Sequence, residues 1–138
     1  MFKCIVVAID GSEPSQRALE AACTLATAFA GEVHLVHALE NKLVEVPPHT
    51  ASWTKESEDG TALMARATAA AQALNVTPAS TTIGEGDAFE EIMTIAGLYS
   101  ADLIVTGRRG LGNLHGLFAG STSQQIAKSA SCAFLSVK

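Results

Sequence analysis

The sequence has few aromatic residues and few cationic ones. Aromatic residues make up 5% of the 138 positions, and 9 Lys and Arg stand against 14 Asp and Glu, which gives a net charge of −5. A chain with this charge lacks the broad cationic surface that holds nucleic acid phosphates. We therefore expect no nucleic acid partner.

Cysteine is scarce as well. The three cysteines, Cys4, Cys23 and Cys132, form no CxxC pair and stand in hydrophobic surroundings. An odd number without metal-type spacing indicates reduced, buried thiols rather than a disulfide framework. This pattern favours a cytoplasmic protein whose core needs no covalent crosslinks.

Long hydrophobic runs are absent. The apolar stretches are interrupted by Glu20, Glu32 or Asp102 before they reach the roughly 18 residues that a membrane-spanning helix needs. The apolar opening run ends at Asp10 without a small-residue cleavage site, so it does not look like a secretory signal. We expect no membrane partner.

Small and aliphatic residues dominate what is present. Hydrophobic residues make up 48% of the chain, and a length close to one typical domain predicts a single unit over residues 1–138. The pattern alternates between short apolar runs and alanine-rich helical segments. Strands are expected at 3–9, 32–39, 77–83, 102–106 and 132–137, helices at 17–30, 61–74, 87–99 and 121–130, and a long loop at 41–60. Asp10-Gly11-Ser12 and Pro14 predict a turn and a Ser12 cap at the start of the first helix, and Gly31 predicts its end. This order predicts an α/β fold, an open parallel five-stranded sheet with helices on both faces.

Glycines are concentrated after the fourth expected strand. They occur at 107, 110, 112, 116 and 120, and hydroxyl residues follow at 121–123, where a helix is expected to begin. Glycine allows backbone N–H groups to approach an anion, and a helix N-terminus attracts phosphate. The alternative is a purely structural loop in which Ser121 only caps the helix. Neither the P-loop motif nor GxGxxG after the first strand is present.

The spacing of these glycines is similar to that of a known signature. Gly107-Arg108-Arg109-Gly110, nine further residues and Gly120-Ser121 closely resemble the ATP-binding signature of the universal stress protein family. The segments KCIVVAIDGSEPSQRALEAA, EVHLVHAL and ADLIVTGRRG resemble the family's strands and turns. One departure is Ala133, where many members have proline.

The resemblance implies a Rossmann-like sheet of strand order 3-2-1-4-5, with a nucleotide at the carboxyl ends of strands one and four. It implies that Asp10 contacts the nucleoside, that Ala8 and Ala38 flank the adenine, and that Thr106 leads into the phosphate loop. The full set of expected cofactor-binding residues is Ala8, Asp10, Ala38, Thr106, Gly107, Arg108, Arg109, Gly110, Gly120, Ser121 and Thr122.

The function expected from this resemblance is that of an ATP-binding stress-response or regulatory protein, with Mg2+ bridging the phosphates. Alternatives are a cyclic AMP binder, a slow ATP hydrolase, and an interaction module with a purely structural glycine loop. No catalytic residue is expected, because no P-loop lysine or general base is evident. A homodimer formed through the hydrophobic last strand is expected as well. His34 and His37 should point to opposite faces of their strand, which argues against a zinc site made by this pair.

Overall fold

The computed structural model describes residues 1–39, 51–108 and 121–138, with side chains omitted for 51–59 and 121. Five parallel strands form one sheet in the order β3-β2-β1-β4-β5. The strands are β1 (Cys4–Ala8), β2 (Glu32–Leu39), β3 (Ser80–Glu85), β4 (Leu103–Gly107) and β5 (Ala133–Val137); the helices are α1 (Glu13–Phe29), α2 (Ala51–Ala73), α3 (Ala88–Leu98) and α4 (Ser121–Ser129). The expected fold class and strand order are confirmed.

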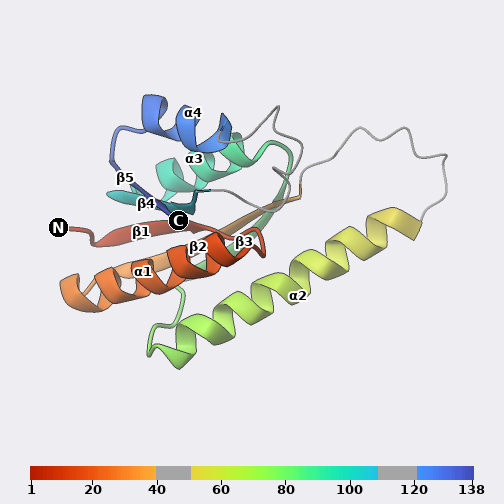
Figure 1. The fold of residues 1–138 in the computed structure, drawn as a ribbon, viewed down its shortest axis with the longest axis horizontal. Helices are drawn as coiled ribbons and strands as arrows, with labels where there is room; N and C mark the ends of the chain where they lie inside the picture. Colours follow the sequence, from red (N-terminus) through yellow and green to blue (C-terminus); the bar gives the residue numbers. More distant parts are fainter. Residues whose placement is uncertain (40–50, 109–120) are drawn as a thin grey trace.

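The helices cover both faces of the sheet, with α1 and α2 on one side and α3 and α4 on the other (Figure 1). Alternate residues of β1 take part in two separate cores, because successive side chains on a strand point to opposite faces. Ile5 and Val7 pack with α1 and α2, whereas Val6 packs with α3 and α4. The central strands are therefore buried on both faces, as their continuous apolar runs predict.

Helix α1 begins as its sequence predicts but ends differently. Ser12 is the N-cap and its side chain accepts a hydrogen bond from the Ser15 backbone N–H, with Pro14 in the first turn. The expected terminal glycine is not the cap: Ala30 adopts the left-handed conformation, with φ of 52°. Gly31 serves a different need, because a Cβ there would lie 2.3 Å from the Phe2 carbonyl oxygen.

The expected loop over 41–60 is wrong for its last ten residues, because α2 begins at Ala51. The polarity of this stretch suggested a loop, but its Lys, Glu and Ala residues have good helix propensity, and residues 51–60 contain no proline. Helix α3 fits its prediction more closely, since the Asp87 side chain caps it by accepting from the Glu90 N–H at 3.3 Å.

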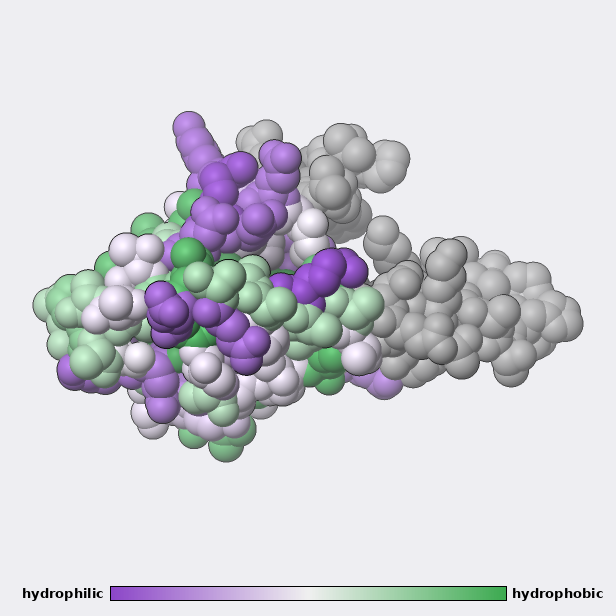
Figure 2. Space-filling view, turned by 90° about the horizontal axis from the view of Figure 1, so that it is seen from below, coloured by the Kyte–Doolittle hydropathy of each residue, from purple (hydrophilic) through white to green (hydrophobic). Residues whose placement is uncertain are grey.

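Helices α1 and α2, which form one side of the molecule, are rich in alanine. Seen from that side, pale hydrophobic residues alternate with hydrophilic ones over the described surface (Figure 2). In the part of the chain that the structure describes, no helix has the length and apolarity needed to cross a membrane.

Candidate functional site

The carboxyl ends of β1 and β4 lie next to each other at the centre of the sheet. The two strands are parallel neighbours, with Val7 in register with Val105. The chain leaves β1 toward α1 on one face, whereas the next helix after β4, α4, lies on the opposite face (Figure 1). In open α/β sheets, ligands bind in the crevice beyond the strand ends at which the chain paths diverge in this way.

Three of the expected residues share one face of the sheet at this end. Ala8 is half-buried and packs against the cluster formed with α3 and α4. Thr106 follows Val105, which packs toward α1, so the Thr106 side chain points to the α3 and α4 face. Ala38, also half-buried, is near the end of β2 on the same face. The small alanine side chains leave room above the strand ends.

Thr106 is 4% exposed, and its Oγ1 has no hydrogen-bond partner among the described residues. A buried hydroxyl without a partner costs about 1 to 3 kcal/mol. Such a group at a strand end in a crevice is well placed to bond to a ligand. The role of Thr106 as a ligand contact stays a prediction.

Asp10 is exposed just beyond β1, and two serines of the following turn fix its position. Its Oδ1 accepts from the backbone N–H of Ser12 at 2.8 Å and from the Ser12 hydroxyl, while Ser15 Oγ accepts from the Asp10 backbone N–H at 3.1 Å. A carboxylate held in this way can accept hydrogen bonds from ligand hydroxyl groups. Sequence reasoning assigned Ser12 only to capping and did not identify its role in holding Asp10.

Gly107, the first glycine of the signature, has a structural reason to be glycine. A Cβ at this position would lie 2.6 Å from both the Pro14 carbonyl carbon and the Ser15 nitrogen. Arg108 is exposed, and its backbone N–H donates to the Val137 carbonyl at 2.6 Å. Gly107 therefore packs against the start of α1, and Arg108 directly follows the end of β4.

The remaining signature residues are described only in part. Arg109, Gly110 and Gly120 lie outside the described residues. Ser121 is the first residue of α4 rather than the residue before it, and Thr122 is half-buried in the first turn. The first N–H groups of an α-helix such as α4 have no partner within the helix, and together with the positive end of the helix dipole they favour an anion.

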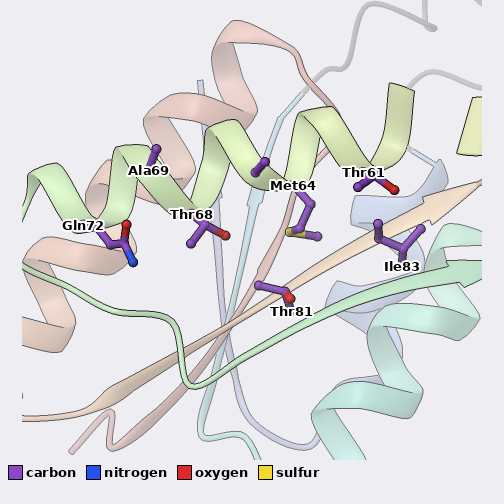
Figure 3. Close-up of a pocket in the computed structure, with 8 residues that line it drawn as sticks. Thr61, Met64, Thr68, Ala69, Gln72, Thr81 and Ile83 are labelled. Carbon is purple, nitrogen blue, oxygen red and sulfur yellow. The ribbon is translucent and has the colours of Figure 1, made fainter. Parts of the chain in front are cut away.

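The described part of the molecule also contains a groove of about 390 Å³ between α2 and β3. Met64, Thr68 and Gln72 project from α2 toward Thr81 and Ile83 of β3 (Figure 3). This groove borders an edge strand on the α1 and α2 face, whereas Thr106 and Ala8 face α3 and α4. It is therefore separate from the crevice at the centre of the sheet.

The strand order and the crevice define a doubly wound α/β protein of the kind that binds ligands at a topological switch point. The sequence profile described as "Universal stress protein family" matches residues 1–138, so the chain belongs to this family. It is 34% identical over 141 residues to "Universal stress protein in QAH/OAS sulfhydrylase 3'region" of Thermus aquaticus, and the match covers 100% of both chains.

Solved structures show the same fold. Hypothetical protein MJ0577 is 25% identical with a TM-score of 0.80, covering 100% of this chain and 96% of that one. A universal stress protein in complex with cAMP is 22% identical with a TM-score of 0.77, covering 99% and 97%. One from Archaeoglobus fulgidus in complex with dAMP is 16% identical with a TM-score of 0.73, covering 100% and 98%.

Proposed function

We propose that this universal stress protein binds an adenine nucleotide, with ATP as its ligand, in the crevice at the carboxyl ends of β1 and β4. The observation that carries the proposal is the buried Thr106 hydroxyl at the strand end, which has no hydrogen-bond partner in the described parts of the chain. In this arrangement the adenine lies over Ala8 and Ala38, and Asp10 accepts hydrogen bonds from the nucleoside. The cAMP and dAMP complexes of structural neighbours support an adenine nucleotide as the ligand class.

ATP is favoured over cAMP by the length of the phosphate-binding element. The signature from Gly107 to Ser121 ends at the N-terminus of α4, and the glycine backbone together with a helix start offers more N–H donors than one cyclic phosphate can use. Arg108 is exposed at the start of this element and contributes positive charge. Mg2+ would bridge the phosphates and neutralise part of their charge. A cAMP ligand remains the alternative.

The proposed role is binding without efficient turnover. The signature lacks the lysine of a P-loop, which contacts the transferred phosphate in many ATPases. Asp10, the carboxylate at the crevice, already accepts two hydrogen bonds from Ser12, which hold it as an acceptor for the nucleoside. The bound nucleotide would then act as a regulatory ligand of a stress-response protein rather than as a substrate.

The test combines nucleotide analysis with titration calorimetry. Mass spectrometry of denatured, freshly purified protein should find ATP, and titration should give tighter binding of ATP than of cAMP. Gly120→Val should abolish ATP binding without changing the circular dichroism spectrum, and Gly97→Val is the control, because a Cβ at Gly97 meets nothing within 4 Å. Unchanged ATP affinity in Gly120→Val would contradict phosphate binding by the loop. Robust multiple-turnover ATP hydrolysis that is lost in Asp10→Ala would favour an enzyme.

The protein is also proposed to form a homodimer through β5. This strand pairs with β4 on one side and ends the sheet on the other. An exposed edge strand with hydrophobic side chains favours pairing with another strand, and Leu135 is 36% exposed there. Pairing of two β5 strands would join the sheets of two subunits and cover this edge.

A further inference from the structure

A second group of potential ligand residues lies at the opposite end of the strands. Cys4 and Glu32 are the first residues of β1 and β2, and they are partners in the strand register. His34 is two residues after Glu32, so its side chain is on the same face of the sheet. Together they form a cluster at the amino ends of two neighbouring strands, whereas the proposed nucleotide crevice lies at the carboxyl ends.

The three side chains bring a sulfur, a nitrogen and an oxygen together. One ligand atom from each residue lies within 4.8 Å of those of the other two. His34 Nε2 is 3.0 Å from Glu32 Oε1. His34 and Cys4 are 2% and 9% exposed, while Glu32 is exposed and gives the cluster an opening to solvent.

The His34 ring is held in one orientation from two further sides. Its Nδ1 is 2.7 Å from Ser80 Oγ on β3. The Tyr99 ring, at the end of α3, stacks on it with 3.9 Å between centroids and an interplanar angle of 20°. Metal-ligating histidines are oriented in this way, with the second ring nitrogen donating to a polar partner. Without a metal, Nε2–H donates to Glu32 Oε1 and Nδ1 accepts from the Ser80 hydroxyl. With a metal bound, Nδ1–H would donate to Ser80 Oγ and the lone pair of Nε2 would face the ion.

Negative groups surround this cluster. Asp102 lies beside Cys4, since its Oδ1 accepts from the Cys4 backbone N–H at 3.2 Å and its Oδ2 from that of Lys3 at 2.8 Å. The ammonium group of Lys3 donates instead to the Phe29 carbonyl oxygen. The carboxylates of Glu32 and Asp102 therefore favour a cation at the cluster.

We propose that Cys4, Glu32 and His34 bind one zinc ion. Thiolate, imidazole and carboxylate are all common zinc ligands, and tetrahedral zinc with these bond lengths separates its ligand atoms by about 3.3 to 3.6 Å. Glu32 Oε1 and His34 Nε2 are already 3.0 Å apart, so the remaining adjustment falls to the Cys4 side chain, and water completes the coordination. On binding, Cys4 loses its thiol proton to solvent and gives up its bond to the Tyr99 carbonyl.

This site does not depend on the proposed nucleotide function. The bound ion would join the amino ends of β1 and β2 and fix His34 against Ser80. The competing interpretation is that His34 and Glu32 form an ordinary polar pair beside an inert buried thiol. The two interpretations differ in one measurable property, because only a metal site creates a bond from Cys4 sulfur to a metal.

Cobalt(II) titration of the reduced, chelator-treated full chain tests that bond, because tetrahedral cobalt bound by thiolate gives a near-ultraviolet charge-transfer band and visible d–d bands. We expect both bands to saturate at one equivalent and to disappear when zinc is added. Cys4→Ala should lose the charge-transfer band, while Cys23→Ala, with its cysteine on α1, should retain it. The absence of the band in the wild type, or its persistence in Cys4→Ala, would overturn the proposal.

Glu32→Gln provides a test that leaves the core untouched, because the Glu32 side chain is 56% exposed. We expect at least a tenfold loss of zinc affinity in competition titrations. Ser80→Ala should weaken zinc binding by about 10 to 100-fold, the usual effect of removing the partner of a ligating histidine. His37→Gln is the control on the same strand, since His37 binds the Ile9 carbonyl instead. Equal zinc affinity in Glu32→Gln and wild type would contradict the site.

Discussion

Gly107 packs against Pro14 so closely that a side chain at position 107 has no room: a Cβ would lie 2.6 Å from the Pro14 carbonyl carbon. The end of β4 and the start of α1 therefore depend on this glycine, whatever ligand occupies the crevice. The sequence predicted a phosphate-loop role for Gly107, and the structure adds a packing role.

Gly107→Ala should therefore destabilise the protein even without nucleotide. Forcing a methyl group into a filled space typically costs about 1 to 3 kcal/mol. We expect a loss of this size in the free energy of unfolding measured with urea. Gly97→Ala is the control, because that position in α3 is open and should show no loss. Equal stability of Gly107→Ala and wild type would mean that the close approach is not required.

Thr106→Val should stabilise the ligand-free protein and weaken ATP binding. The substitution keeps the shape and removes a buried hydroxyl that has no partner within residues 1–39, 51–108 and 121–138, so the free energy of unfolding should rise by about 1 kcal/mol. ATP affinity should fall about tenfold if that hydroxyl bonds to the ligand. Calorimetry and thermal unfolding measure the two effects.

The control for this variant is Thr27→Val, because the Thr27 hydroxyl of the wild type donates to the Cys23 carbonyl at 3.0 Å. This control should not gain stability and should bind ATP as the wild type does. If Thr106→Val and wild type bind ATP equally, the Thr106 hydroxyl is not a ligand contact.

Ser12→Ala should affect both the fold and the ligand. Loss of an N-cap costs about 0.5 to 2 kcal/mol, and Asp10 would lose the hydroxyl that holds its carboxylate. We expect weaker binding of adenosine and ATP alike. Asp87→Ala removes the cap of α3 and should cost similar stability without changing nucleotide affinity. Equal nucleotide affinity in Ser12→Ala and wild type would show that Asp10 needs no such support.

The stability of the protein should fall at alkaline pH, partly because of Cys23. Burial, followed by the nearby charge of Glu20, raises the pKa of the Cys23 thiol above its ordinary 9.0. The unfolded chain then loses this proton at lower pH than the folded protein, so the free energy of unfolding decreases as pH rises above about 9.

Urea unfolding of wild type and Cys23→Ala between about pH 8 and pH 10 measures this contribution. One group contributes at most about 1.4 kcal/mol per pH unit, and the variant should show the shallower decline. Parallel curves for the two proteins would contradict a raised pKa at Cys23.

Leu135→Glu should convert the proposed dimer into a monomer. The substitution places a charge on the exposed edge strand, a common way in which proteins prevent pairing of such edges. Sedimentation velocity at tens of micromolar should show a dimer for the wild type and a monomer for the variant. Leu98→Glu, at an exposed position on α3, should remain dimeric. A wild-type monomer at this concentration would contradict the proposal.

The sequence patterns predicted each element of the sheet, and the resemblance supplied the strand order. The start of α2 was missed because polar residues after Pro48 were interpreted as a loop although they also favour a helix. The end of α1 was missed because the need for glycine at position 31 comes from the distant Phe2 carbonyl. Such requirements depend on tertiary contacts.

In the candidate site too, some features could be predicted from the sequence and others depend on tertiary contacts. The family resemblance implied roles for Asp10 and Thr106, but not that the Thr106 hydroxyl is buried without a partner among the described residues. The cluster of Cys4, Glu32 and His34 depends on the register between β1 and β2. Residues about 30 positions apart cannot be aligned to one another from a strand pattern alone, because a one-residue shift reverses the face of every side chain.

The position of β1 in the middle of the sheet also has a consequence for folding during synthesis. The two strands that pair with β1 come from very different parts of the chain. Strand β2 is the next strand in the sequence, whereas β4 lies much later, with Ile5 of β1 paired to Leu103 of β4. Strands β1, β2 and β3 can associate while the ribosome is still making the rest, but one edge of β1 then stays open. We expect a nascent chain that stops before β4 to depend on chaperones, since its most hydrophobic strand would expose unpaired backbone groups.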